Sequence, residues 1–258
     1  ETGYKGWSKT LPQVWPEVPE EEHYTPPRII QATDVHYQSA DAEDDGAAFQ
    51  LFVERCDGKV VKYLPQLLDA FMDQVIAEKP TALVLSGDIT MNGERMNHEE
   101  LAARLKRVQD AGIQVLVIPG NHDINNHNAA VYYGAQKEPA PYIDGPEFYE
   151  IYHEYGYDQA LSRDSGSLSY VYALDDRNWL LMLDSCQYEP DNKVEGRLKD
   201  STMTWADEQL ARAEEEGVFV IPIAHHNLLA QSRMYTTQCA MDNNKEVISL
   251  LQKYELPL

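Results

Sequence analysis

The sequence predicts an α/β fold with a largely buried central sheet. Three observations predict it: strand-like and helix-like segments alternate, several strand-like segments are continuously apolar, and no internal repeat interrupts this order. Strands that are apolar at every position are typical of a sheet covered on both faces. With 258 residues and 43% hydrophobic content, the chain can form such a core.

The first half of the chain supplies three strands and two helices in alternation. Leu64, Leu67 and Leu68 repeat at helical spacing, and Pro80 follows the end of that helix. Gly112 closes the second helix, because glycine readily adopts the left-handed conformation found at helix ends. The expected strands are residues 28–33, 82–86 and 114–118, and the expected helices are residues 60–78 and 98–111.

The second half of the chain continues the alternation. The apolar segments NWLLML and VFVIPIA predict strands. Ser201 or Thr202 would cap the helix between them, and Gly217 would end it. The expected strands are residues 178–183 and 218–224, and the expected helices are residues 202–216 and 243–254.

Two segments do not follow the alternation. Residues 1–27 are rich in proline and glutamate and have no period, so we expect an extended arm that leads into a domain of residues 28–258. Residues 124–166 are crowded with tyrosines and show helical character only around residues 146–155. We interpret this segment as a long excursion that its tyrosines pack onto the body of the domain; ordered loops of this length are often functional.

The charge of the chain argues against one class of function. With 43 acidic and 21 basic residues the net charge is −22, whereas a non-specific nucleic-acid surface needs a basic stripe. The acidic balance is compatible with a soluble protein that binds cations, although solubility alone is the simpler explanation. No apolar run is long enough to span a membrane.

The cysteines and the first residue bear on the compartment. Cys56, Cys186 and Cys239 are too scattered for a zinc knuckle and too few for a disulfide framework, though one disulfide could form. The sequence starts at Glu1 without a methionine, which is compatible with removal of a leader peptide. We therefore favour an extracytoplasmic location over a cytoplasmic one.

Polar residues able to bind metals directly follow four of the predicted strands. In an open α/β sheet, ligands bind outside the carboxyl ends of the strands. These exits would converge there if the strands are parallel neighbours. The four exits are Asp34-Val35-His36, Gly87-Asp88, Gly120-Asn121-His122-Asp123 and His225-His226.

The side chains at these exits suit a pair of transition metals. Asp34 and His36 are two residues apart, so in an extended segment they point to one side and form a chelating pair. Asp88 could bridge two metals with its two oxygens, while Asn121 offers a neutral oxygen and His225 an imidazole. Mixed nitrogen and oxygen ligands favour Mn, Fe, Zn, Co or Ni over Ca or Mg. Two such ions about 3.5–4 Å apart would clamp a phosphoryl group and acidify a bridging water.

Each motif also has a simpler structural explanation. An Asp-x-His triplet is common by chance, an aspartate after glycine usually caps a turn, and a buried His-His pair is more often hydrogen-bonded in a core than bound to metal. Their recurrence in this order, always at a strand exit, favours a metal site. Asp184 and Ser185 follow a further predicted strand, and we interpret them as a turn cap.

The order Asp-x-His, Gly-Asp, Gly-Asn-His-Asp and then His, between residues 28 and 226, resembles the calcineurin-like metallophosphoesterase superfamily. Within it, the chain is most similar to the branch of bacterial phosphodiesterases. The resemblance implies a four-layer α-β-β-α sandwich with a dinuclear metal site. It also implies ligand roles, with Asp34 and His36 on the first metal, Asn121 and His225 on the second, and Asp88 on both.

Three further residues receive roles from the resemblance. His122 would face the substrate as an acid or electrostatic stabiliser, and Asp123 would orient it. His226 follows the expected ligand His225 and would support it from behind. A hydroxide bridging the two metals would attack phosphorus in line, while the metals absorb the charge on the phosphoryl oxygens.

One motif of the superfamily is missing from the sequence. Its pattern ends with Gly-His-x-His at a later strand exit, where the two imidazoles complete the two metals. No histidine follows His226, and the sequence ends at Leu258 after a predicted helix. We expect that the chain is cut before this motif. The alternatives are that the remainder lies on a longer chain, or that the protein is a degenerate member that binds metal weakly.

The sequence therefore predicts a dinuclear-metal phosphoesterase, and within that class a phosphodiesterase acting on a small-molecule phosphoester. Two alternatives stay open. One is a phosphomonoesterase with the same metals, and the other is a non-catalytic binding protein that lacks the last two ligands. The oligomeric state cannot be predicted from the sequence.

Overall fold

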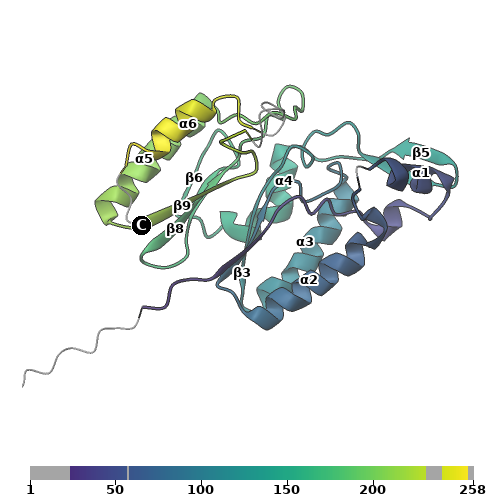
Figure 1. Cartoon of the computed structure of the whole chain (residues 1–258), viewed down its shortest axis with the longest axis horizontal. Helices are drawn as coiled ribbons and strands as arrows, with labels where there is room; N and C mark the ends of the chain where they lie inside the picture. Colours follow the sequence, from purple (N-terminus) through teal and green to yellow (C-terminus); the bar gives the residue numbers. More distant parts are fainter. Residues whose placement is uncertain (1–23, 57, 231–239, 255–258) are drawn as a thin grey trace, which may run out of the picture.

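Two β-sheets, each with helices packed against it, form most of the structure (Figure 1). The computed structural model describes residues 24–56, 58–230 and 240–254. Most of the expected N-terminal arm, together with Cys239, lies outside the described residues.

The first sheet carries three of the four motif-bearing strand exits. β1 (Ile29–Ala32), β2 (Ala82–Ser86) and β3 (Gln114–Ile118) are parallel and lie in that order. Every residue of β2 is buried, as its apolar sequence predicts for the central strand of a covered sheet. Helices α2 (Leu64–Glu78) and α3 (Arg95–Asp110) share one apolar cluster with this sheet. Because the strands are parallel, their carboxyl ends meet at one edge.

The second sheet carries the remaining motif-bearing exit. It contains β6 (Ser162–Arg163), β7 (Tyr170–Ala173), β8 (Asn178–Leu183) and β9 (Phe219–Ala224), adjacent in this order. β8 and β9 are parallel, and the other neighbours are antiparallel. The carboxyl ends of β8 and β9 therefore lie side by side.

Side chains of β8 pack on both faces of the second sheet. Leu180 and Met182 belong to the apolar cluster that contains the first sheet. Leu181 points to the opposite face and packs with helices α5 (Asp200–Glu216) and α6 (Asn244–Leu251). The second sheet is thus covered on both faces, which explains the continuously apolar sequence of β8.

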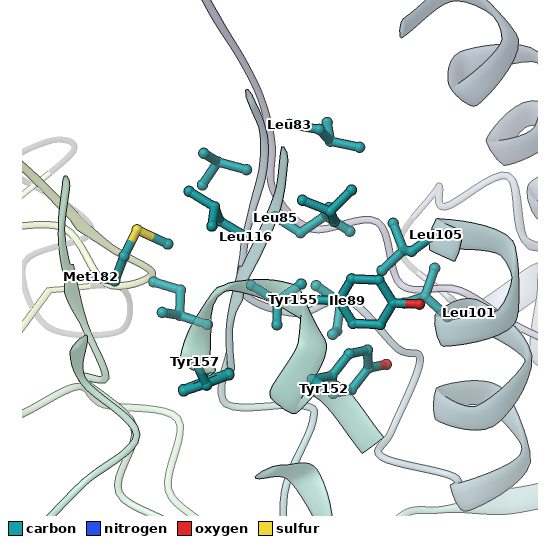
Figure 2. Close-up of a cluster of buried hydrophobic side chains, with 14 of the residues drawn as sticks. Leu83, Leu85, Ile89, Leu101, Leu105, Leu116, Tyr152, Tyr155, Tyr157 and Met182 are labelled. Carbon is teal, nitrogen blue, oxygen red and sulfur yellow. The ribbon is translucent and has the colours of Figure 1, made fainter. Parts of the chain in front are cut away.

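The tyrosine-rich excursion folds into a hairpin and a helix. β4 (Ala130–Tyr133) and β5 (Gln136–Pro139) pair antiparallel. Helix α4 (Gly145–Tyr152) lies where the sequence predicts a helix, and it continues into a π-helical turn, η3 (His153–Tyr157). Figure 2 shows three tyrosines of this region within the main apolar cluster: Tyr152, Tyr155 and Tyr157.

The α/β class predicted from the sequence is confirmed, and β2, β3 and β8 begin and end at the predicted residues. The four-layer α-β-β-α order stays a prediction. The sequence did not indicate helix α1 (Ala47–Arg55). It also did not indicate the β4–β5 hairpin, because β5 is short, mostly polar and exposed. Two 3₁₀ turns, η1 (Ala40–Ala42) and η2 (Val61–Tyr63), precede α1 and α2.

The start of α5 differs from the predicted cap. The helix begins at Asp200, and neither Ser201 nor Thr202 caps it. The Thr202 hydroxyl instead donates to Asp164 Oδ2 at 2.6 Å, a tertiary partner that no local pattern reveals. Gly217 ends the helix as predicted, with a left-handed φ of 67°.

Two sequence expectations about disulfides and membranes can be compared with the described residues. Cys56 and Cys186 are both buried and free, so they do not form a disulfide with each other. Among the helices that the structure describes, none has the length and apolar character needed to cross a membrane.

Candidate metal centre

The four motif-bearing strand exits converge on one cavity of about 470 Å³. Its lining includes all five predicted metal ligands and His122: Asp34, His36, Asp88, Asn121, His122 and His225. Only β1, β2 and β3 are neighbours, however, because β9 belongs to the second sheet. The cavity therefore lies between the carboxyl ends of two sheets, which corrects the expectation of four neighbouring strands.

Three of the predicted ligands have a strained backbone. Asp34, His36 and Asp88 have φ values of 54°, 47° and 47°, in the left-handed region that residues other than glycine rarely adopt. Asp34 and His36 thus do not lie in an extended segment, contrary to the sequence-based expectation, yet Asp34 Oδ1 and His36 Nε2 still lie 3.8 Å apart. Strain of this kind persists only where the surrounding structure holds it, and it is concentrated at functional sites.

Two glycines allow the loops to approach each other closely. A Cβ on Gly120 would lie 2.0 Å from the backbone nitrogen of Asp88, and a Cβ on Gly87 would lie 2.6 Å from the His225 ring. Gly87 also has a φ of 96°, which disfavours any side chain. Both positions need glycine, because a larger residue would displace Asp88 or His225.

Asp88 presents its two oxygens to different histidines. Oδ2 lies 3.8 Å from His36 Nε2 and 3.9 Å from His122 Nε2, whereas Oδ1 lies 3.4 Å from His225 Nε2. Oδ1 also accepts a hydrogen bond from the His122 backbone N–H at 2.8 Å. Burial alone would raise the pKa of Asp88, but the hydrogen bond and charge of His225 lower this pKa below its usual value. Asp88 is therefore ionised and placed to serve two cations.

His36 is a buried imidazole whose Nδ1 has no hydrogen-bond partner among the described residues. Its Nε2 faces the carboxylates of Asp34 and Asp88 at 3.8 Å, which is longer than a hydrogen bond. Burial lowers the pKa of His36 to about 4, so the ring is neutral near pH 7 and keeps a lone pair. A buried ring with unused hydrogen-bonding capacity beside two carboxylates fits a metal ligand.

His225 and Asn121 form another side of the cavity. The His225 Nδ1–H donates to the Ser86 carbonyl at 3.1 Å, which turns Nε2 toward Asn121 Oδ1 at 3.2 Å. Burial would lower the pKa of His225, but its hydrogen bond to Asp88 and the Asp88 charge outweigh burial and raise the pKa to about 9. A cation bound here would displace the proton on Nε2.

The His122 ring is held by the loop after β2. Its Nδ1 lies 2.7 Å from the Met91 carbonyl oxygen and 3.2 Å from Asn92 Oδ1. Because a carbonyl oxygen only accepts, Nδ1 carries the hydrogen and Nε2 faces the Asp88 carboxylate. The ring also packs edge-on against His36, with centroids 4.7 Å apart. His122 thus presents one nitrogen, in a defined tautomer, to the contents of the cavity.

Asp123 does not contact the His122 ring, contrary to the expected orienting role. Its carboxylate is fully buried and accepts from the backbone N–H groups of Ile89, Thr90 and Gly120 and from the Thr90 hydroxyl. All four distances lie between 2.8 and 3.1 Å. These bonds tie the loop after β3 to the loop after β2, so Asp123 acts on the site through the backbone.

His226 lies beside His225 but outside the donor groups. Its Nε2–H donates to the Val194 carbonyl at 2.9 Å, and its Nδ1 accepts from the Ser185 hydroxyl at 2.7 Å. Burial and the charge of His225 lower the pKa of His226 to about 4. Both nitrogens are therefore used within the protein, and the ring supports the wall of the cavity.

Sequence reasoning missed several residues that shape the cavity. Four more residues that line it were not predicted as site residues: Thr33, Lys59, Val194 and Asn227. Asn192 holds the turn after β3, because its side-chain amide donates to the carbonyls of Asn121 and Ile124 at 2.7 Å. These residues belong to no motif. No local signal identified them, because Lys59, for example, is one of 21 basic residues in the chain.

The donor atoms fit divalent cations. Two groups of three residues bring ligand atoms within 4.8 Å of one another: His36, Asp88 and His122 in one, and Asp34, Asp88 and His225 in the other. Asp88 belongs to both groups, as a shared ligand would. The groups differ from the expected ligand sets in including His122 and in separating Asp34 from His36. Mixed carboxylate and imidazole donors suit transition metals better than Ca or Mg.

Comparisons with known proteins were informative for family and fold. The family model described as calcineurin-like phosphoesterase matches residues 27–258. Among solved structures, a dimetal phosphatase from Danio rerio aligns with a TM-score of 0.56 at 14% identity, covering 89% of this chain and 79% of that chain. At this identity the likeness shows the fold alone. A search of the curated proteins found no match.

Proposed function

The chain belongs to the calcineurin-like phosphoesterase family of metal-dependent phosphohydrolases, and from this premise we propose that it hydrolyses a phosphodiester in the cavity between its two sheets. The observation that carries the proposal is Asp88, a buried carboxylate whose oxygens face the histidines of two overlapping donor groups. A shared carboxylate of this kind suits a two-metal phosphoester site.

Five residues would hold two divalent transition-metal ions: Asp34, His36, Asp88, Asn121 and His225. When bound, the ions supply Lewis-acid chemistry, because they neutralise charge on phosphoryl oxygens and acidify a water. The donors stand on short loops anchored by buried strands and by the Asp123 hydrogen bonds. The protein therefore contributes rigid ligand positions that need little rearrangement when substrate binds.

His122 is the side chain placed to transfer a proton. The Met91 carbonyl holds its Nδ1–H, so Nε2 is the nitrogen that faces the cavity. When protonated, Nε2 can donate to the oxygen of the departing group; it also stabilises negative charge that develops on the phosphoryl oxygens. The Asp88 carboxylate lies 3.9 Å from Nε2.

Space beside the cavity supports a substrate with two organic groups. A second, more apolar cavity of about 380 Å³ shares His226 and Asn227 with the first. Its other walls include Leu183, Leu228 and Met241. A diester has two substituents, and we place one of them in this apolar cavity while the phosphoryl group lies among the donors.

A phosphomonoester is the second candidate substrate. The solved structure that shares this fold is described as a phosphatase. Lys59 in the cavity wall also favours the more highly charged monoester, whose second ionisation has a pKa of about 6. The same donors would serve either substrate.

Metal content and two model substrates test the proposal. Protein loaded with Mn²⁺ or Zn²⁺ should retain two ions per chain by elemental analysis and should hydrolyse bis(p-nitrophenyl) phosphate faster than p-nitrophenyl phosphate. Faster hydrolysis of the monoester would favour the second candidate. A protein that binds neither Mn²⁺ nor Zn²⁺ and hydrolyses neither substrate would contradict the enzymatic proposal. It would favour a non-catalytic binding protein.

A further inference from the structure

We propose that Lys59 binds the phosphoryl group of the substrate and contributes to the affinity of the site for its negative charge. This inference rests on the proposed function. Lys59 is the single lysine or arginine among the described residues that line the 470 Å³ cavity. It shares that cavity with all the predicted metal ligands and with His122, so Lys59 belongs to the same site.

The backbone on either side of Lys59 is anchored. Its N–H donates to the Cys56 carbonyl at 3.1 Å, and the Cys56 thiol donates back to the Lys59 carbonyl at 3.3 Å. Cys56 and Val61 are buried in one apolar cluster, which also contains Met91. Because the Met91 carbonyl holds the His122 ring, the Lys59 loop and the catalytic histidine rest on the same packed cluster.

The Lys59 ammonium, by contrast, has no hydrogen-bond or ion-pair partner within the described part of the chain, although its side chain is half-buried. Lys62, three residues later, pairs with Asp45 at 2.8 and 3.0 Å. Acidic residues outnumber basic ones by 43 to 21 in this chain, so carboxylates are abundant. Lys59 is therefore free to meet an anion that comes from solution.

The positive charge of Lys59 favours an anionic ligand in the cavity. Lys59 lines the same cavity as the donor groups. A positive charge there repels divalent cations and opposes metal binding. A phosphoryl group reverses the sign of this interaction, because its oxygens are attracted by the ammonium as well as by the ions.

The substitution Lys59→Met tests this role, because it removes the charge and keeps the length of the side chain. Inorganic phosphate should bind the metal-loaded variant about tenfold more weakly than the wild type in calorimetric titrations, the loss expected for one charge-assisted hydrogen bond. Metal content should stay the same. KM should rise by a similar factor while kcat changes by less than about twofold. Lys59→Arg should recover most of the phosphate affinity.

A comparison of substrates separates a charge effect from a structural one. p-Nitrophenyl phosphate carries more negative charge than bis(p-nitrophenyl) phosphate. Because electrostatic attraction scales with charge, Lys59→Met should weaken the binding of the monoester more than the binding of the diester. Lys62→Met is the matched control. Lys62 lies three residues from Lys59, but it pairs with Asp45 and does not line the cavity. Its replacement should therefore leave the phosphate affinity unchanged.

The outcomes distinguish this inference from the function on which it rests. Equal phosphate affinity in wild type and Lys59→Met would overturn the role of Lys59 and leave the phosphoesterase proposal intact. Loss of metal from Lys59→Met would also overturn it, because the lysine would then support the metal centre instead. If the wild type holds no metal and hydrolyses neither substrate, the proposed function fails, and the role of Lys59 fails with it.

Discussion

Asp88 and Asp184 occupy comparable places, one in each sheet. Each follows a buried strand, β2 or β8, and each is almost fully buried, with 4% and 3% of its surface exposed. Asp184 accepts hydrogen bonds from the backbone N–H groups of Leu168 and Cys186 and from the Tyr188 hydroxyl. Asp88 accepts one backbone N–H and otherwise faces imidazole nitrogens. The two carboxylates are thus buried to nearly the same extent, and they differ in the groups that they contact.

This difference separates a structural carboxylate from a functional one. Burial raises the pKa of Asp184, whereas His225 overcomes burial and lowers the pKa of Asp88. Asp184 has its hydrogen bonds supplied by residues near its own strand. Asp88 faces groups whose bonding capacity is incomplete, including the unpaired Nδ1 of His36. Burial of an aspartate at a strand exit therefore does not identify a site, and unsatisfied neighbours do.

The substitution Asp88→Asn should have the largest effect of any at the two exits. It keeps the shape of the side chain but removes the charge that both donor groups share, so both metals should be lost. Hydrolysis should fall by about a thousandfold or more, because the ions supply several kcal/mol of stabilisation. Elemental analysis and steady-state rates measure both effects. A variant that kept two ions per chain would refute the shared-ligand role.

Replacing His122 with alanine should separate catalysis from metal binding at the exit of β3. We expect turnover to fall by roughly 10²–10⁴-fold, the usual contribution of a general acid, with metal content close to that of the wild type. His122 also belongs to one donor group, so the metal analysis decides between the two roles. Loss of metal together with activity would assign His122 as a ligand.

The substitution Asp184→Asn should affect stability and leave the chemistry unchanged. An amide cannot accept all the hydrogen bonds that Asp184 accepts, so at least one buried donor would lose its partner. Chemical denaturation should show a loss of about 1–3 kcal/mol in the free energy of unfolding. Metal content should not change. A large loss of metal without a loss of stability would remove the distinction between the two aspartates.

Two buried histidines differ in the same way, because both ring nitrogens of His98 are hydrogen-bonded whereas Nδ1 of His36 has no partner. His98 Nε2–H donates to the Asp123 carbonyl at 2.9 Å, and Nδ1 accepts from the Tyr152 hydroxyl at 3.0 Å. Burial lowers the pKa of His98 to about 3 from its usual 6.5. Below pH 6.5 the unfolded chain therefore binds a proton that the folded protein does not bind, and stability falls as the pH decreases toward 3.

This pH dependence gives an effect of about the same size as that of Asp184→Asn. Between pH 7 and pH 5, His98 should account for a loss of about 2 kcal/mol in the free energy of unfolding. The variant His98→Gln cannot titrate, so its unfolding free energy should decrease less over that interval. Denaturation of both proteins at the two pH values measures the difference. Parallel pH profiles would show that His98 titrates equally in the folded and unfolded states.

Local patterns in the chain were enough to predict the α/β class, most of the central strands and the candidate donor residues at the strand exits. Apolar runs such as β2 and β8 must be buried wherever they occur, and polar residues directly after them must lie at a sheet edge. The motif residues from Asp34 to His225 could therefore be named without a structure, because each signal lies within a few residues of the chain.

Long-range contacts decided the rest. They placed β9 in a second sheet, so that His225 reaches Asp88 across the gap between two sheets. They directed the Asp123 carboxylate to backbone amides of another loop, and they brought Lys59 into the cavity wall. These outcomes depend on residues distant in sequence that become neighbours only when both sheets are packed, and no local pattern of polarity or spacing specifies such pairs.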